Sequence, residues 1–141
     1  MVIVAIAVVL IGGAVAYLTF VAKPAAPAAP VLTQEAKDYI QNFKFSDVGL
    51  QAAESYINSS VVEVLGKITN TGNRRVKLLE VWCVFRNVNE KPIYRELATI
   101  IGKTGPIGTG ETKSFRLAFE NPPAGWNQAM PDLVIAQIHF E

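Results

Sequence analysis

The sequence predicts an all-β protein: an antiparallel β-sandwich that follows one transmembrane helix and a linker rich in proline and alanine. Two observations predict this class. The chain opens with a long uncharged apolar run, and from Phe43 onward short segments of alternating apolar and polar residues are separated by clusters of Gly, Pro and Asn. We therefore expect a transmembrane anchor over residues 1–22, a linker over 23–33, and a sandwich domain with a short N-terminal helix over 34–141.

The apolar run over residues 2–22 reads VIVAIAVVLIGGAVAYLTFVA, and the first charged residue after it is Lys23. About 20 apolar residues span a bilayer core as a helix, because each residue rises about 1.5 Å. A cleaved secretory signal is the alternative, since Ala14-Val15-Ala16 matches a cleavage motif, but no basic residue precedes the run. Gly12 and Ala16 form a small-xxx-small pair, a candidate contact between two membrane helices or simply part of an ordinary anchor.

The predicted topology is single-pass, with membrane lipid around residues 1–22. Lys23 alone would place the domain in the cytoplasm by the positive-inside rule, but one lysine is a weak determinant, and we expect the extracytoplasmic side. Prolines at every third position, Pro24, Pro27 and Pro30, favour an extended polyproline II spacer. Thr33 is then placed to cap a short helix over Gln34–Asn42 that must pack on the domain to be stable.

Six segments rich in β-branched and aromatic residues follow, at the spacing of a sandwich or barrel: Phe43–Glu54, Val61–Asn70, Val76–Asn87, Ile93–Ile101, Thr112–Phe119 and Leu133–Phe140. Most of them are apolar on one face only, as a half-buried strand requires. In the last segment the strict alternation assigns one face to Val134, Ala136, Ile138 and Phe140.

The segment Val76–Asn87 is apolar on both faces, so it is either a covered central strand or a strand with an apolar outer surface. If Phe85 pairs with Ile93, Trp82 and Tyr94 share the outer face. A slip of one residue would bury Trp82 instead. The sequence leaves this register open.

Three motifs resemble FxLYD-like domains. Gly66-Lys67-Ile68-Thr69-Asn70-Thr71-Gly72 is similar to their G-x-I-x-N-x-G strand and turn, Leu79-x-Val81-x-Cys83-x-Phe85 is similar to the next strand, and Gly105–Phe115 is similar to their L-x-P-G-E-x-x-x-F segment. The tail Gly125–Pro131 looks like that of uncharacterised membrane-anchored bacterial proteins. The resemblance implies an immunoglobulin-like fold, a cell-envelope setting and no known catalytic activity.

No pattern of residues predicts catalysis, a metal site or a cofactor. His139 is the single histidine and Cys83 the single cysteine, and zinc would need three or four such ligands or carboxylates. The 13 Lys and Arg residues are balanced by 12 Asp and Glu residues, so no basic face for nucleic acid is expected. Cys83 alternates with Val81 and Phe85, which indicates a core position.

Three aromatic residues form the candidate interaction surface: Trp82, Tyr94 and Trp126. Trp126 lies in a long loop rich in Pro and Gly, where an exposed ring could anchor a partner or could fold back to close the sandwich. The leading hypothesis is a non-catalytic, tethered module that binds or supports an unidentified envelope protein, with a homo-oligomer as a further option. The alternatives are a pilin-like filament subunit, although Ala5 stands where such subunits carry a glutamate, and a small-ligand or lipid carrier.

Overall fold

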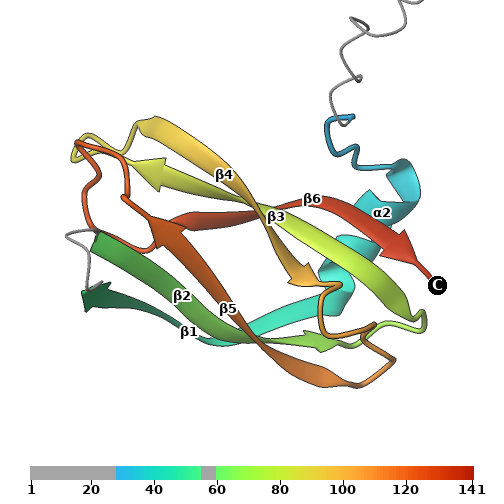
Figure 1. Cartoon of the computed structure of the whole chain (residues 1–141). Helices are drawn as coiled ribbons and strands as arrows, with labels where there is room; N and C mark the ends of the chain where they lie inside the picture. The colour runs from blue at the N-terminus through green and yellow to red at the C-terminus, as the bar shows by residue number, and fades with distance from the viewer. Residues whose placement is uncertain (1–27, 55–59) are drawn as a thin grey trace, which may run out of the picture.

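Two antiparallel three-stranded sheets pack face to face in the computed structural model, which describes residues 28–54 and 60–141 (Figure 1). A short helix precedes the strands. The elements in chain order are α2 (Gln34–Tyr39), the 3₁₀ turn η1 (Ile40–Asn42), β1 (Phe43–Glu54), β2 (Ser60–Asn70), β3 (Val76–Arg86), β4 (Pro92–Ile101), β5 (Thr112–Glu120) and β6 (Asp132–Phe140). The predicted all-β sandwich is confirmed at this level, and each predicted strand agrees with an observed one to within a residue at either end.

The strand order is β1-β2-β5 in one sheet and β4-β3-β6 in the other. The chain therefore changes sheets three times, between β2 and β3, between β4 and β5, and between β5 and β6. All four pairings within the sheets are antiparallel. This arrangement places β2 and β3 at the centres of the two sheets, and it leaves β1, β5, β4 and β6 as edges.

The predicted membrane anchor, the Gly12–Ala16 pair and the first part of the linker lie outside the described residues. Within residues 28–54 and 60–141, no helix is long and apolar enough to cross a bilayer. The predictions for residues 1–22 therefore stay predictions.

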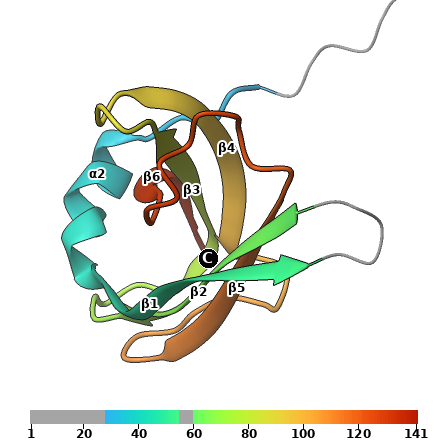
Figure 2. The same cartoon turned by 90° about the vertical axis from the view of Figure 1, so that its left-hand side faces the viewer.

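Helix α2 begins where the sequence predicts, because the Thr33 hydroxyl accepts a hydrogen bond from the Ala36 backbone N–H at 3.2 Å. A helix of six residues is not stable alone, so it depends on packing. Helix α2 lies beside β1 and β6 and covers the side of the sandwich between these two edge strands (Figure 2). The Tyr39 ring meets Phe43 and Phe140 edge to face, with centroids 5.5 and 5.0 Å away, and so connects both sheets.

A buried polar cluster fixes α2 to the turn between β2 and β3. Asn70 is fully buried, and its side-chain oxygen accepts from the Tyr39 hydroxyl at 2.8 Å and from the Gly72 N–H at 3.1 Å. Its amide nitrogen donates to the Arg74 carbonyl at 2.7 Å. A side chain at Gly72 would collide with the Tyr39 hydroxyl, so only glycine permits this approach.

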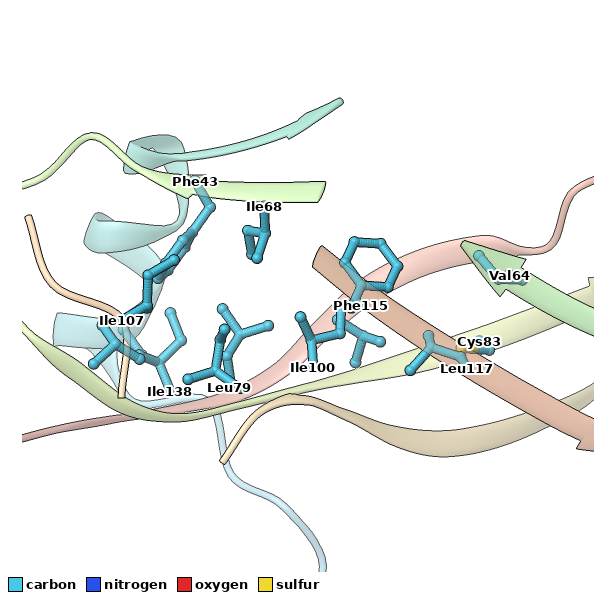
Figure 3. Close-up of a cluster of buried hydrophobic side chains, with 14 of the residues drawn as sticks. Phe43, Val64, Ile68, Leu79, Cys83, Ile100, Ile107, Phe115, Leu117 and Ile138 are labelled. Atoms are coloured by element: carbon cyan, nitrogen blue, oxygen red, sulfur yellow. The ribbon is translucent and has the colours of Figure 1, made fainter. Parts of the chain in front are cut away.

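The core lies between the sheets and is filled by the inward-facing residues of the alternating strands (Figure 3). Strand β3 contributes five side chains that are fully buried: Val76, Leu79, Val81, Cys83 and Phe85. Close packing also explains Gly66, since a Cβ atom there would lie 2.6 Å from Cζ of Phe115. The predicted core position of Cys83 is confirmed.

The register between β3 and β4 differs from the pairing that would place Trp82 and Tyr94 together. Phe85 pairs with Tyr94, and Trp82 pairs with Leu97. A register shift between Phe85 and Arg86 adds a residue to β4 and moves its alternation by one position. Of the registers that the sequence left open, the observed one keeps Trp82 on the outer face and places Tyr94 on the opposite face.

Candidate interaction surface

The outer face of the β1-β2-β5 sheet is polar and internally paired. Lys67 forms an ion pair with Asp47 at 3.3 Å, and Arg116 forms one with Glu63. The hydroxyls of Thr69 and Thr112, directly opposed across β2 and β5, lie 2.7 Å apart. Val61 and Leu65 of β2 also lie on this face, but each is directly opposite a charged residue of β5, Glu120 or Arg116, so charged groups interrupt its apolar area.

The outer face of the β4-β3-β6 sheet has an apolar cluster at its centre, between rows that also carry charged residues. Trp82 lies at its centre, directly opposite Leu97 on β4 and Val134 on β6. Val84 lies two residues further along β3 and pairs with Arg95 on β4, and Ile93 lies two residues before Arg95 and lines the same hollow as Val84. The side chains of Val134 and Ile93 are 51% and 39% exposed. These five residues, Trp82, Val84, Ile93, Leu97 and Val134, are called the apolar patch below.

One cation is placed over the apolar patch. The Arg95 guanidinium lies 4.4 Å from the centroid of the Trp82 ring, a cation–π geometry that also orients the ring. Arg95, Val84 and Ile93 together with Pro92 and Tyr94 line a hollow of about 350 Å³. Arg95 therefore contacts both the Trp82 ring and the hollow at the Val84 and Ile93 end of the patch.

Tyr94 lies at the margin of this hollow and faces the inner side of its sheet. Its ring is 46% exposed and packs against Phe85 with centroids 5.8 Å apart. The hydroxyl donates to the Glu96 carboxylate at 3.1 Å, and this bond, with the nearby negative charge, raises the pKa of Tyr94. Tyr94 is therefore a neutral contact residue at physiological pH.

Trp126 is packed against the core. Of the two possibilities that the sequence left open, the ring therefore folds back onto the sandwich. Its ring meets Phe85 edge to face at 5.5 Å, and its indole N–H donates to the Ala129 carbonyl at 3.1 Å. The Asn127 N–H bonds the Arg86 carbonyl, which ties the loop to the end of β3. Trp126 closes this end of the sandwich, and its partly exposed ring is held in one orientation.

The structure therefore divides the three predicted aromatics into two places. Tyr94 and Trp126 meet at the Phe85 ring, whereas Trp82 lies on the outer face of the same sheet. The remaining patch residues were not singled out from the sequence. The only feature of the sequence that indicated an apolar outer surface was the apolar character of both faces of β3.

Val134 corrects a second expectation. The strict alternation in β6 places it on the same face as Ala136 and Ile138, yet it is exposed and they are buried. The pairing with β3 shifts between Glu80 and Val81, where the bulge in β6 reverses the alternation. Val134 therefore joins the outer surface beside Trp82.

The groups with reactive side chains have ordinary surroundings. Burial, with a smaller contribution from Glu96, raises the pKa of the Cys83 thiol to about 12, so the thiol stays protonated. His139 is exposed on β6. Across the described ranges 28–54 and 60–141, no three His, Cys, Asp or Glu residues lie together in a way that could hold a metal ion.

A second hollow, of about 440 Å³, lies at the seam between the edge strands β4 and β5. Ile100 and Phe115 at its base are 8% and 7% exposed, so they offer little surface to a ligand. Lys103 and Arg116 line its polar rim.

No protein-family model and no curated protein sequence matches this chain. Two solved structures do, each at 14% sequence identity. A crystal structure named for the ApaA protein of Bordetella pertussis covers 70% of this chain and 90% of its own, with a TM-score of 0.42. An X-ray structure of a structural-genomics target covers 71% and 86%, with a TM-score of 0.44. Neither likeness carries a functional argument, and the FxLYD-like resemblance stays a prediction.

Proposed function

We propose that this chain is a membrane-tethered, non-catalytic binding module with an immunoglobulin-like sandwich, which holds a protein partner of the cell envelope through the apolar patch. The tether is the apolar run of residues 2–22, and the Pro-spaced linker separates it from the domain. The two antiparallel sheets with three crossings between them agree with an immunoglobulin-like topology.

The difference between the two outer faces is the observation that carries this proposal. The sheets have the same number of strands, yet one outer face is paired and polar and the other has Trp82 flanked by Leu97 and Val134. Core packing does not require apolar residues on an outer face. An apolar cluster around a half-buried Trp with an Arg stacked on it has the composition of an interface hot spot.

The position of the patch supports the same function. The chain enters the domain at α2, and the turns over residues 87–91 and 121–131 lie at the opposite end (Figure 1). Among the described residues, seven large apolar side chains are exposed. Val31 lies at the α2 end and Val48 in β1, and the other five lie toward the far end: Val88, Ile93, Tyr94, Met130 and Val134. A module tethered near α2 would present this end to a partner at a distance from the tether.

The test compares two exposed positions that differ in the face they occupy. Val134→Asp places a charge beside Trp82, and the matched control, Ser114→Asp, places the same charge on the polar outer face of β5. Full-length chain is recovered from its native membranes, and co-purified proteins are quantified by mass spectrometry. Burial of a Val side chain is worth roughly 1.5–3 kcal/mol, so we expect Val134→Asp to lower recovery of a stoichiometric partner at least about tenfold.

Ser114→Asp should leave recovery unchanged. The proposal fails if wild-type chain recovers no partner, either a different protein or a second copy, in stoichiometric amount, or if both variants recover it equally.

A further inference from the structure

We propose that the occupant of the apolar patch is a second copy of this chain, packed face to face about a two-fold axis parallel to β3. The inference rests on the proposed function, because it names the partner of the same surface. It depends on how charged and apolar residues are arranged across the three strands of the outer face.

Two adjacent rows of the β4-β3-β6 sheet carry the argument. In one row, Val84 lies between Arg95 on β4 and Asp132 on β6. In the next row, Trp82 lies between Leu97 and Val134 on the same two strands. The sheet therefore has opposite charges on opposite edges of one row, and apolar residues throughout the other.

A two-fold axis that runs along β3 in the interface places β4 of one copy over β6 of the other. Arg95 then faces Asp132 of the second copy, and the symmetry repeats this pair on the other side of the axis. Leu97 faces Val134 of the second copy, and the two Trp82 rings meet at the axis. An isologous interface of this kind needs a self-complementary surface, and the two rows supply one.

The other in-plane axis, perpendicular to the strands and centred on Trp82, lacks this match. It would place Arg95 over Thr99 of the second copy and Asp132 over Gln137, so no opposite charges would meet. Charge complementarity therefore selects the axis along β3.

Three further charged groups of this face are held within their own sheet: Asp132, Arg86 and Glu80. Asp132 bonds Arg86 at 2.7 Å but keeps a side chain that is 48% exposed, so a carboxylate oxygen can accept a second guanidinium. Arg86 lies on β3 and would face Arg86 of the second copy, but its charge is paired with Asp132. Glu80, also on β3, would face Glu80 of the second copy. Its carboxylate accepts hydrogen bonds from Thr99 and Gln137 on the flanking strands, which hold the charge along the sheet.

The contact is small. Strands about 4.8 Å apart and a rise of about 3.4 Å per residue give a footprint of roughly 15 by 15 Å. Stable interfaces bury roughly 800 Å² per partner, so the pairing should be weak for freely diffusing chains. Tethering two copies in one membrane raises their effective concentration and strengthens the pairing without new contacts.

The test is disulfide crosslinking of the full chain in its membranes, with the double variant Leu97→Cys/Val134→Cys. These positions flank Trp82 on β4 and β6, about 10 Å apart within one chain, which exceeds the roughly 7 Å limit for a disulfide. Only two copies can join them, and the native Cys83 is buried. The matched control is Gln51→Cys/Ala118→Cys, which flanks Glu63 in the same way on the other sheet.

We expect mild oxidation to give covalent dimers of the Leu97/Val134 variant at least about tenfold above the control, as two-fold pairing requires. Adding Arg95→Asp should lower the dimer yield about fivefold, because two carboxylates, the new one at position 95 and that of Asp132, would then face each other across the interface.

Dimer yields equal to those of the control would overturn the second copy as the occupant. If Val134→Asp still abolished recovery of a different protein, the proposed function would stand and this inference alone would fail. If dimers formed but Arg95→Asp did not lower their yield, the axis along β3 would be wrong. Circular dichroism of each variant verifies that the fold is retained.

Discussion

The hydroxyl of Tyr39 tests how the short helix is held to the sandwich. Tyr39→Phe keeps the ring between Phe43 and Phe140 and removes the oxygen alone. That oxygen donates toward the fully buried Asn70 at 2.8 Å and accepts from the Arg74 N–H at 3.0 Å. The substitution therefore removes two hydrogen bonds and leaves a backbone donor without its partner.

The magnitude follows from these bonds. Each intramolecular hydrogen bond contributes about 0.5–1.5 kcal/mol, and an unsatisfied donor costs more. Asn70 still accepts from Gly72, which limits the loss on that side. We expect the free energy of unfolding to fall by about 2 kcal/mol. For a domain near 100 residues this lowers Tm by roughly 8–12 °C.

The measurement is thermal and urea unfolding of the full chain in detergent, monitored by near-UV circular dichroism. Tyr94→Phe is the matched control, because its hydroxyl also makes a hydrogen bond, to Glu96, but the residue is 46% exposed. We expect the control to change stability by less than about 0.5 kcal/mol. A Tyr39→Phe variant as stable as the wild type, or equal losses in both variants, would refute the locking role of this cluster.

Two further outcomes follow from the core. Gly66→Ala should lower the free energy of unfolding by at least about 1 kcal/mol, because its Cβ would lie 2.6 Å from Phe115 Cζ. Gly49→Ala, with no atom within 4 Å of its Cβ, should be close to neutral. Urea unfolding compares the two variants, and equal effects would contradict the packing described. At pH 9, Cys83 should react with iodoacetamide on the order of 500-fold more slowly in the folded than in the unfolded chain, because a pKa of about 12 leaves little thiolate. Mass spectrometry of the alkylated protein measures the rate of labelling. Rapid labelling of the native chain would show that the thiol is accessible. Because the pKa of Cys83 is raised in the folded chain, the contribution of this thiol to the free energy of unfolding is complete below about pH 9 and is lost as the pH rises toward 12. Cys83→Ala should remove this pH dependence.

The strands and the helix start were predictable because their signals are local. Alternation, β-branched residues and turn clusters define β1 to β6, and the Thr33 hydroxyl bonds a donor only three residues away. The Trp82 position on the outer face was open from the sequence. Its orientation follows from the burial of Val81 and Cys83 on either side.

The registers were not predictable, since they depend on bulges that form only when strands pair. The extra residue near Pro92 moves Tyr94 to the inner side, and the bulge in β6 brings Val134 out beside Trp82. For the same reason, the sequence singled out Trp82 but none of its neighbours in the apolar patch. The predictions for residues 1–22 depend on hydropathy and lie outside the described residues.

The central claim, that one outer face of the sandwich binds a protein, is tested most directly by site-specific photo-crosslinking. A photoreactive amino acid replaces Val134 on the apolar patch or Ser114 on the polar face, in the full chain in its native membranes. The account predicts a discrete covalent adduct with one protein, a second copy or another chain, from position 134 and none from position 114. Equal labelling from both positions, or no adduct from position 134, would contradict it.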